Sequence, residues 1–124
     1  MKTIIYIAIG GGLGSVLRYV TTIFVTKYAS SNFPYATFLT NVLGCLLIGL
    51  FFGYFEKQNT ISQDLKFFLI TGFCGGYTTF SAFSNENIQL LQTNQFFTAI
   101  LYITLSVFIG LLATWVGLFL VKSI

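Results

Sequence analysis

The stretch TGFCGGYTTFSAFSNE, residues 71–86, interrupts an otherwise apolar segment with three glycines and a run of hydroxyl side chains. Only 19 uncharged residues separate Lys66 from Glu86, close to the number that a membrane-spanning helix needs. The Gly75–Gly76 pair, followed by the Thr78–Thr79 pair, weakens a helix at its middle. At membrane depth a broken helix is tolerated only where it is buried in protein or lines a cavity. The stretch therefore predicts a helix broken near its middle, with a functional site at the break.

The composition is that of a membrane protein. Of the 124 residues, 56% are hydrophobic and 7% are charged, whereas roughly a quarter of the residues of a soluble domain are charged. Six basic and three acidic side chains cannot cover the surface of a soluble protein of this size. We therefore expect a single domain, residues 1–124, in a lipid bilayer. The basic residues are scattered and the net charge is only +3, so no nucleic-acid partner is expected.

Charged residues mark the membrane boundaries, because each costs a few kcal/mol at the centre of a bilayer. Three long stretches carry no charge: residues 28–55, 67–85 and 87–121. Together with the apolar N-terminal stretch they predict an all-α integral membrane protein of four transmembrane helices, near residues 3–26, 36–55, 65–90 and 96–121. Four spans place both termini on one side of the membrane.

The distribution of Lys and Arg gives little preference for one orientation. An excess of positive charge in cytoplasmic loops normally orients a membrane protein. Here the basic residues fall on both sides, with Lys2, Lys57, Lys66 and Lys122 on the side of the termini and Lys27 and Arg18 toward the other. Such a weak bias permits insertion in either direction, which is the hypothesis of dual topology.

The residue types on which most enzymes depend are scarce. The chain has no His, which removes the commonest general base and metal ligand. Its two cysteines form no Cys-x-x-Cys pair. Of its carboxylates, Glu56 and Asp64 are expected in loops and only Glu86 is not. We therefore expect no catalytic residues and no enzymatic activity.

Two of the predicted helices carry a stripe of polar and small residues spaced by four, which places them on one helical face. The stripe of the second helix is Thr37, Asn41, Cys45, Gly49 and Gly53, and that of the fourth is Tyr102, Ser106, Gly110 and Thr114. The glycines favour close helix packing. The amide of Asn41 either lines a permeation path or forms an interhelical hydrogen bond. The hydroxyls of the fourth helix either line a path or bond to carbonyls of their own helix.

Phe80 and Phe83 follow the predicted break and project to neighbouring faces of one helical turn. Aromatic pairs usually pack in a core or face lipid. The edge of a phenyl ring is electropositive, however, so rings turned edge-on toward a pore would stabilise an anion without a buried fixed charge. At the break itself, freed backbone carbonyls would hold a cation, as half-helix ends do in transporters.

Three segments resemble the signature segments of a known family, the CrcB (Fluc) fluoride channels. They are GGGLGSVLRY at residues 10–19, FPYATFLTNVLGCLLIG at 33–49 and GFCGGYTTFSAFSNE at 72–86. Their order and spacing also agree with the family. With the polar face of the fourth helix, the resemblance covers essentially the whole chain.

The resemblance implies an antiparallel, dual-topology homodimer in the bacterial inner membrane. Such a dimer exports cytoplasmic fluoride by passive electrodiffusion through two pores and lowers fluoride toxicity. The residues that match the fluoride pathway are Asn41, Phe80, Ser81, Phe83, Ser84, Glu86, Tyr102, Ser106 and Thr114. The backbone carbonyls of Gly75 and Thr78 match a structural sodium site on the dimer axis. Arg18 matches a vestibule or structural charge of the first helix.

Four positions depart from the family pattern. Tyr77 stands where Phe is common, Cys45 and Ala82 stand where hydroxyls are usual, and Gly110 lacks a hydroxyl that some relatives carry. None of the four belongs to the aromatic pair or replaces Asn41. The departures therefore concern only the completeness of the hydroxyl tracks.

Two other classes of membrane protein are the alternatives. A small multidrug exporter is also a weakly oriented four-helix dimer, but its proton coupling requires a carboxylate deep in the first helix, and this helix has none. A structural or assembly subunit without transport agrees with the glycine-rich faces. It does not explain an amide such as Asn41 beside a broken helix. Fluoride efflux separates all three classes.

Overall fold

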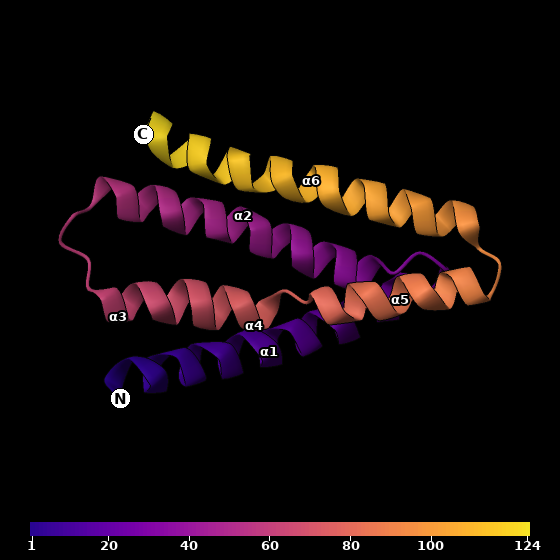
Figure 1. The fold of residues 1–124 in the computed structure, drawn as a ribbon, viewed down its shortest axis with the longest axis horizontal. Coiled ribbons are helices and arrows are strands. Elements are labelled where there is room, and N and C mark those ends of the chain that lie inside the picture. Colours follow the sequence, from indigo (N-terminus) through magenta and orange to yellow (C-terminus); the bar gives the residue numbers. More distant parts are fainter.

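The computed structural model describes residues 1–124, which form four long helical segments lying side by side and no strand (Figure 1). Three segments are single helices: α1 (Lys2–Tyr28), α2 (Tyr35–Lys57) and α6 (Phe96–Ser123). The third segment along the chain consists of α3 (Gln63–Lys66), the π-helix η1 (Phe67–Cys74), α4 (Gly75–Tyr77) and α5 (Phe80–Gln92). The expectation of an all-helical chain with four helical segments is confirmed, and their ends agree with the predicted ends to within two residues.

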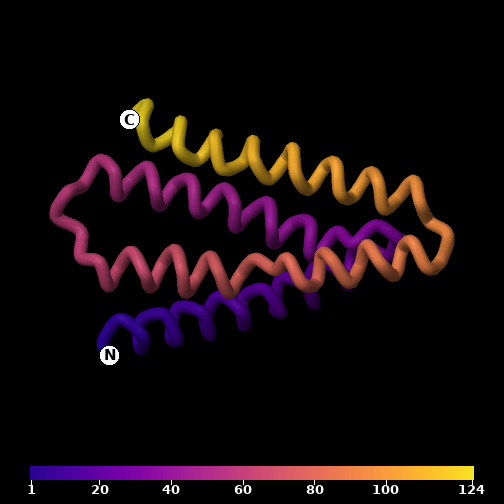
Figure 2. Tube along the Cα trace, in the orientation of Figure 1, coloured from indigo at the N-terminus to yellow at the C-terminus, as the bar shows by residue number.

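Three of the segments are long and apolar enough to cross a membrane. Their most apolar windows have a mean hydropathy of 1.4 in α1, 1.9 in α2 and 2.3 in α6. The third segment is not one uninterrupted helix, and none of its pieces is long enough to cross alone. The trace of the chain places both termini at the same end of the molecule (Figure 2), as four antiparallel passes require.

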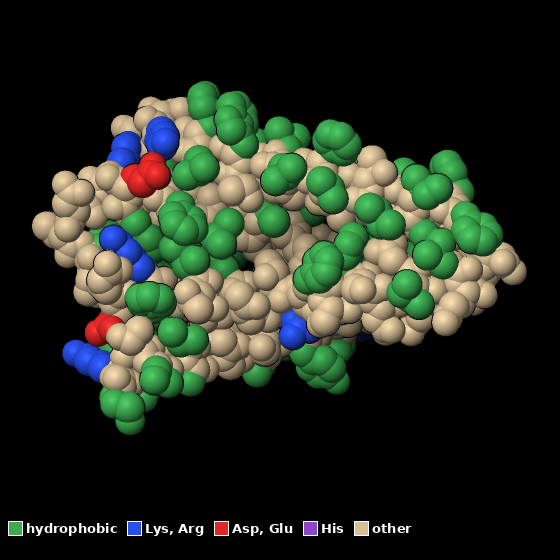
Figure 3. Space-filling model, in the orientation of Figure 1, with side chains coloured by type: hydrophobic (Ala, Val, Ile, Leu, Met, Phe, Trp, Pro, Cys, Tyr) green, Lys and Arg blue, Asp and Glu red, His purple; other side chains and the backbone are tan.

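The surface of the protein is apolar along its sides. Only 18 of 124 residues are buried, and large hydrophobic side chains are exposed on every long helix. Hydrophobic side chains are spread along the visible face, whereas most charged side chains gather at the end where the termini lie (Figure 3). A soluble monomer rarely exposes so much contiguous apolar surface. The chain is therefore a membrane protein whose sides face lipid or another protein.

Glycines bring the backbones of neighbouring helices into direct contact. Gly10 and Gly14 of α1 lie against the backbone of η1, and Gly49 of α2 lies against Gly117 of α6. A methyl group at any of these four positions would collide with a backbone oxygen of the facing helix. The close packing that the glycine spacing favours is thus present in the structure.

The turns and the small core fix the ends of the segments. Pro34 precedes α2 directly, and Asn94 makes the turn from α5 to α6 with a φ of 63°, a conformation that Asn tolerates better than most residues. Next to this turn lies the core, which consists of Leu90, Ala99 and Tyr102 with Phe33, Phe38 and Phe83 packed against it. The core therefore holds α5 and α6 together on one side of the interruption.

Candidate functional site

The third segment is interrupted between α4 and α5. Thr78 and Thr79 have extended backbone, with φ/ψ values of −87°/160° and −153°/112°. The first half ends with hydrogen bonds from the N–H and the hydroxyl of Thr78 to Cys74 O, at 3.0 and 2.9 Å. The second half begins with a cap in which Thr79 Oγ1 accepts a hydrogen bond from Ala82 N at 3.1 Å. Each threonine thus terminates one of the two half-helices.

The residues before the interruption wind as a π-helix, a feature that the sequence pattern did not predict. Residues 67–74 form η1, and the N–H of Gly75 still donates to Ile70 O, five residues back. A π-type turn, with its i→i+5 hydrogen bonds, is rare and frequently marks a functional site. Here it leads directly into the two extended residues.

Asn41 of α2 joins the interrupted backbone with both ends of its amide. Its Oδ1 accepts a hydrogen bond from Thr79 N at 2.8 Å, and its Nδ2 donates to Thr79 O at 3.2 Å. In a continuous helix these two backbone groups would bond within the helix. Asn41 therefore replaces the missing helical bonds. The second N–H of its amide makes no hydrogen bond within the chain.

A cavity of about 300 Å³ lies beside the interruption, between α2 and the third segment. Its lining residues are Asn41, Gly44, Cys45, Ile48, Ile70, Cys74, Gly75, Thr78, Thr79 and Phe80. A water molecule occupies about 30 Å³ in the liquid, so the cavity is large enough for a small ion with part of its hydration shell. It contains no charged side chain.

The two phenylalanines after the interruption have different surroundings. Their ring centroids are 5.7 Å apart with an interplanar angle of 41°. Phe83 packs on the core, with its centroid 4.9 Å from that of Tyr102. Phe80 is 78% exposed. A single chain thus supplies one fixed ring and one ring that no part of the same chain covers.

Glu86 connects three helices. Its Oε2 accepts a hydrogen bond from the Thr37 hydroxyl of α2 at 2.7 Å, and its Oε1 accepts one from the Tyr102 hydroxyl of α6 at 2.9 Å. Nearer the interruption, Ser81 Oγ lies 3.2 Å from Thr79 Oγ1, whereas Ser84 makes no hydrogen bond within the chain. The carboxylate is therefore held by two neutral donors and has no cationic partner.

The hydroxyls of α6 divide into two kinds. Thr114 Oγ1 donates toward Cys45 O at 3.1 Å and toward Gly110 O at 3.3 Å, so it satisfies backbone carbonyls of α2 and of its own helix. Ser106 Oγ is buried and has no hydrogen-bond partner. A buried hydroxyl without a partner is unusual. Ser106 is thus the one hydroxyl of this face without a hydrogen-bond partner in the chain.

Arg18 of α1 approaches the interruption from the other side. Its Nε donates a hydrogen bond to Gly76 O at 3.1 Å, which places a positive charge at the carbonyl end of α4, where a helix carries partial negative charge. The neighbouring carbonyl oxygens of Gly75 and Thr78 accept no hydrogen bond in the chain. The interruption thus leaves backbone oxygens available to a cation.

The structure gathers part of the predicted residues around one cavity. Asn41, Gly75, Thr78 and Phe80 line it, Phe83 lies next to Phe80, and Glu86 and Tyr102 form a separate bonded pair. Thr79, the partner of Asn41, was not predicted as a site residue. Thr37 was not predicted as a site residue either, although its position on the polar stripe of α2 could have indicated it.

Comparison with known proteins identifies the family. The family model described as CrcB-like protein, Camphor Resistance (CrcB), matches residues 5–118. A fluoride-specific ion channel FluC of Flavobacterium psychrophilum is 73% identical over 124 residues, which is the full length of both chains. The protein of the same name from Bacteroides fragilis is 46% identical over 120 residues, or 94% of each chain. That of Pseudomonas fluorescens is 41% identical over 121 residues, or 98% of each chain.

The chain belongs to the CrcB family. The match covers nearly all of the sequence, and the three segments that carry the resemblance lie within it. The family resemblance predicted from the sequence is confirmed. The members of this family are not enzymes, which agrees with the absence of catalytic residues expected from the composition.

Proposed function

We propose that this protein is a fluoride-selective channel that exports cytoplasmic fluoride by passive electrodiffusion and so lowers fluoride toxicity. Its relatives carry the name fluoride-specific ion channel. The observation that carries the proposal is the Asn41 amide on the extended Thr79 backbone, beside an uncharged cavity in an otherwise apolar bundle. Such a device is unnecessary for packing alone, because a continuous helix would satisfy the same backbone groups.

The chemistry of the cavity suits a small, strongly hydrated anion. A selective pore must replace the hydration shell without trapping the ion. A buried lysine or arginine would hold fluoride too tightly and would be expensive to desolvate. At the cavity, the free N–H of Asn41 and the ring edge of Phe80 each present a partial positive charge. The ring edge of Phe83, next to Phe80, and the hydroxyl of Ser106 lie outside the cavity lining and would add further ones. Fluoride would pass between them in small steps.

The remaining polar residues extend this path. Ser81, Ser84 and Glu86 follow the interruption along α5, and Tyr102, Ser106 and Thr114 follow each other along α6. The hydrogen bonds from Thr37 and Tyr102 to Glu86 hold its carboxylate in place. Because the hydroxyls of Thr37 and Tyr102 bond to Glu86 and that of Thr114 bonds to backbone carbonyls, the serine hydroxyls would be the donors that an anion meets.

Two copies in antiparallel orientation form the channel in this proposal. Phe80 is 78% exposed and Gly75 is exposed, so the cavity beside them is open on one side in the single chain. A second copy across this face would close two equivalent pathways, one for each Phe80. The weak charge bias between the two ends permits the opposite orientation of the partner. We place the dimer in the bacterial inner membrane, since its relatives come from bacteria.

A sodium ion on the dimer axis is part of the proposal. The carbonyl oxygens of Gly75 and Thr78 carry no hydrogen bond, and unwound carbonyls at half-helix ends are typical sodium ligands. Two copies would supply these oxygens twice. When bound, the ion would supply a fixed positive potential near the anion path. Arg18 adds a positive charge on the outer side of the same carbonyl end.

Fluoride efflux from liposomes tests this function. The purified protein is reconstituted into vesicles loaded with potassium fluoride, and a fluoride electrode records efflux after the membrane potential is clamped with valinomycin. We expect efflux well above that of protein-free vesicles, and no comparable chloride efflux from chloride-loaded vesicles. A multidrug exporter or a structural subunit would release neither ion, and that result would reject the proposal.

A further inference from the structure

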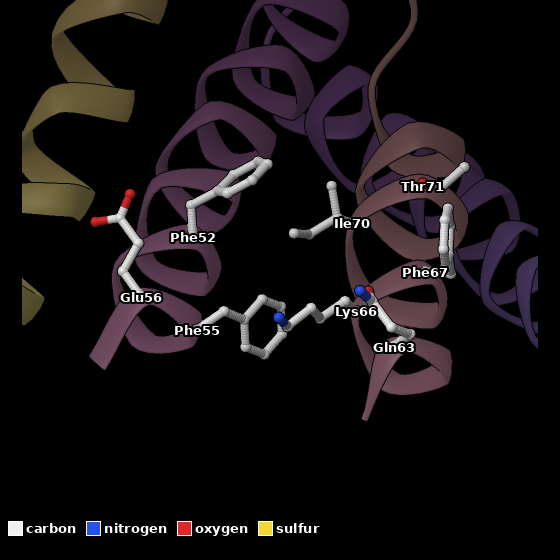
Figure 4. A pocket seen from close by; sticks show the side chains of 8 residues that line it. All are labelled: Phe52, Phe55, Glu56, Gln63, Lys66, Phe67, Ile70 and Thr71. Carbon is white, nitrogen blue, oxygen red and sulfur yellow. The ribbon is translucent and has the colours of Figure 1, made fainter. Parts of the chain in front are cut away.

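A second groove lies between α2 and the third segment, at the charged end of the molecule. It has a volume of about 430 Å³ and is lined by Phe52, Phe55, Glu56, Gln63, Lys66, Phe67, Ile70 and Thr71 (Figure 4). Ile70 also lines the cavity beside Asn41. The two hollows are therefore neighbours along the same pair of helices, one at the membrane boundary and one at the interruption.

Lys66 is the only cation that lines this groove, and it has no ion-pair partner within the chain. Its ammonium group forms no ion pair or hydrogen bond within the chain and lies 5.9 Å from the ring centroid of Phe55. Glu56, the only carboxylate in the lining, is paired with Lys122 at 3.3 Å. In the close view Glu56 points away from Lys66 (Figure 4). Within the groove, Lys66 is therefore the one charged side chain without an ion-pair partner.

From this arrangement we infer that Lys66 collects fluoride at the mouth of the pathway and raises its concentration in front of the interruption. This inference rests on the proposed channel function and adds an entry residue to it. A fixed positive charge in a groove with low-dielectric walls concentrates the field on that groove and attracts anions. Lys66 stays at the boundary, where the ion is still hydrated, so it does not trap the ion as a charge at the interruption would.

The inference predicts a loss of flux that depends on salt. At low ionic strength and low fluoride, Lys66→Gln should reduce fluoride efflux about fivefold, the effect of one unit charge about 4 Å from an ion in water. The difference should shrink at about 0.5 M of an impermeant salt, because screening shortens the range of the charge to a few Å. Lys66→Arg should retain wild-type flux, and Lys66→Glu should reduce it further.

Lys57→Gln is the matched control. Lys57 lies at the same end of the molecule and is exposed at the end of α2, but it does not line the groove. Its replacement changes the net charge by the same amount and should leave efflux unchanged. Size-exclusion chromatography in detergent shows that each variant is folded before it is reconstituted.

The outcomes separate the inference from the channel proposal. If wild-type protein releases no fluoride, both fail. If wild-type protein conducts and Lys66→Gln equals it at every ionic strength, or if Lys57→Gln loses as much flux, Lys66 is not an entry residue. All vesicles are made first of zwitterionic phosphatidylcholine. A Lys66 effect that appears only after anionic lipid is added would assign this lysine to a lipid phosphate and would also overturn the inference.

Discussion

Asn41 has two tasks that compete for its hydrogen-bonding groups. Its oxygen and one of its N–H groups stabilise the backbone of Thr79. The second N–H of the amide has no partner in the chain and is available to an ion in the proposed channel. The bonds to Thr79 fix the orientation of the amide, because an amide held at both ends cannot turn its oxygen toward the cavity. In the proposed channel, the same interaction that supports the interruption would therefore turn a donor, and not an acceptor, toward an anion.

Replacing Asn41 with Ala should reduce both stability and flux. The backbone N–H and C=O of Thr79 would lose their partner inside the membrane, at a cost of roughly 1–3 kcal/mol. We expect a lower unfolding temperature in detergent and at least about a tenfold loss of fluoride efflux. Asn85→Ala, which removes an exposed amide of α5, is the control and should change neither quantity. Wild-type flux through Asn41→Ala would show that the amide is not part of the path.

We expect Phe80 to be required for conduction, although its largely exposed side chain contributes little to the packing of its own chain. Phe80→Ile keeps an apolar side chain of similar size and removes the electropositive ring edge, so fluoride efflux should fall at least about tenfold with little change in stability. Phe97→Ile is a close control, because Phe97 is also 78% exposed, and its efflux should stay at the wild-type level. Equal efflux from both variants would reject the role of the ring edge.

Some site residues could be predicted from the chemistry of their side chains, whereas others depend on the three-dimensional arrangement. Asn41 was identified because an amide in an apolar helix needs partners. Its partner was not, because Thr79 contributes backbone groups that any residue carries. The free hydroxyl of Ser106 and the bonded hydroxyl of Thr114 also occupy equivalent positions in the sequence pattern. Only the neighbouring helix distinguishes them.

At the scale of the helices, the third segment needs its neighbours to keep its shape. Its π-helical turns and extended residues leave it without the regular bonds of an α-helix. The backbone of α1 lies directly on η1 and α4, and Gly14 packs closest, since a Cβ there would collide with the carbonyl oxygen of Phe73 and also reach Tyr77 N at 2.8 Å. The glycine contact thus holds the first half of the broken segment at a fixed depth.

Gly14→Ala should therefore destabilise the fold. The added methyl group forces α1 away from the third segment, which costs roughly 1–3 kcal/mol. Thermal unfolding in detergent, followed by tryptophan fluorescence or aggregation, measures the effect. Gly12→Ala is the control: a Cβ at this position would have no atom of a neighbouring helix within 4 Å, and replacing a glycine in a helix gains up to about 1 kcal/mol. Equal unfolding temperatures would contradict the close contact.

The helical segments were predictable because charges and turn residues mark the membrane boundaries. The winding within the third segment was not. Glycines and threonines lower helix propensity over several residues. Whether the chain then forms a π-helix, a pair of extended residues or both depends on the hydrogen-bonding groups that neighbouring helices supply. Here Asn41 supplies them at Thr79 and Arg18 supplies one at Gly76.

At the scale of the whole molecule, the cavity beside the interruption and the ring of Phe80 lie on an open face of the single chain. Few residues are buried, and the cavity at the interruption has no covering element in the single chain. An antiparallel partner would cover it, and the near balance of charge between the two ends permits that orientation.

Dual topology predicts labelling from both sides of the membrane. A single cysteine is added after Ile124 in a background with Cys45 and Cys74 replaced by Ala, and a membrane-impermeant thiol reagent is applied to either side. Roughly half of the protein should react from each side, since the charge bias is weak. Labelling from one side only would exclude an antiparallel dimer.

The most direct test of passive, selective conduction is the reversal potential of the reconstituted protein in a planar bilayer. Fluoride and chloride gradients are set in opposite directions across the membrane. If uncharged groups around the interruption conduct fluoride passively and selectively, the current reverses at the equilibrium potential of fluoride and does not follow the chloride gradient. Reversal at the chloride potential, or no current at all, would contradict this mechanism.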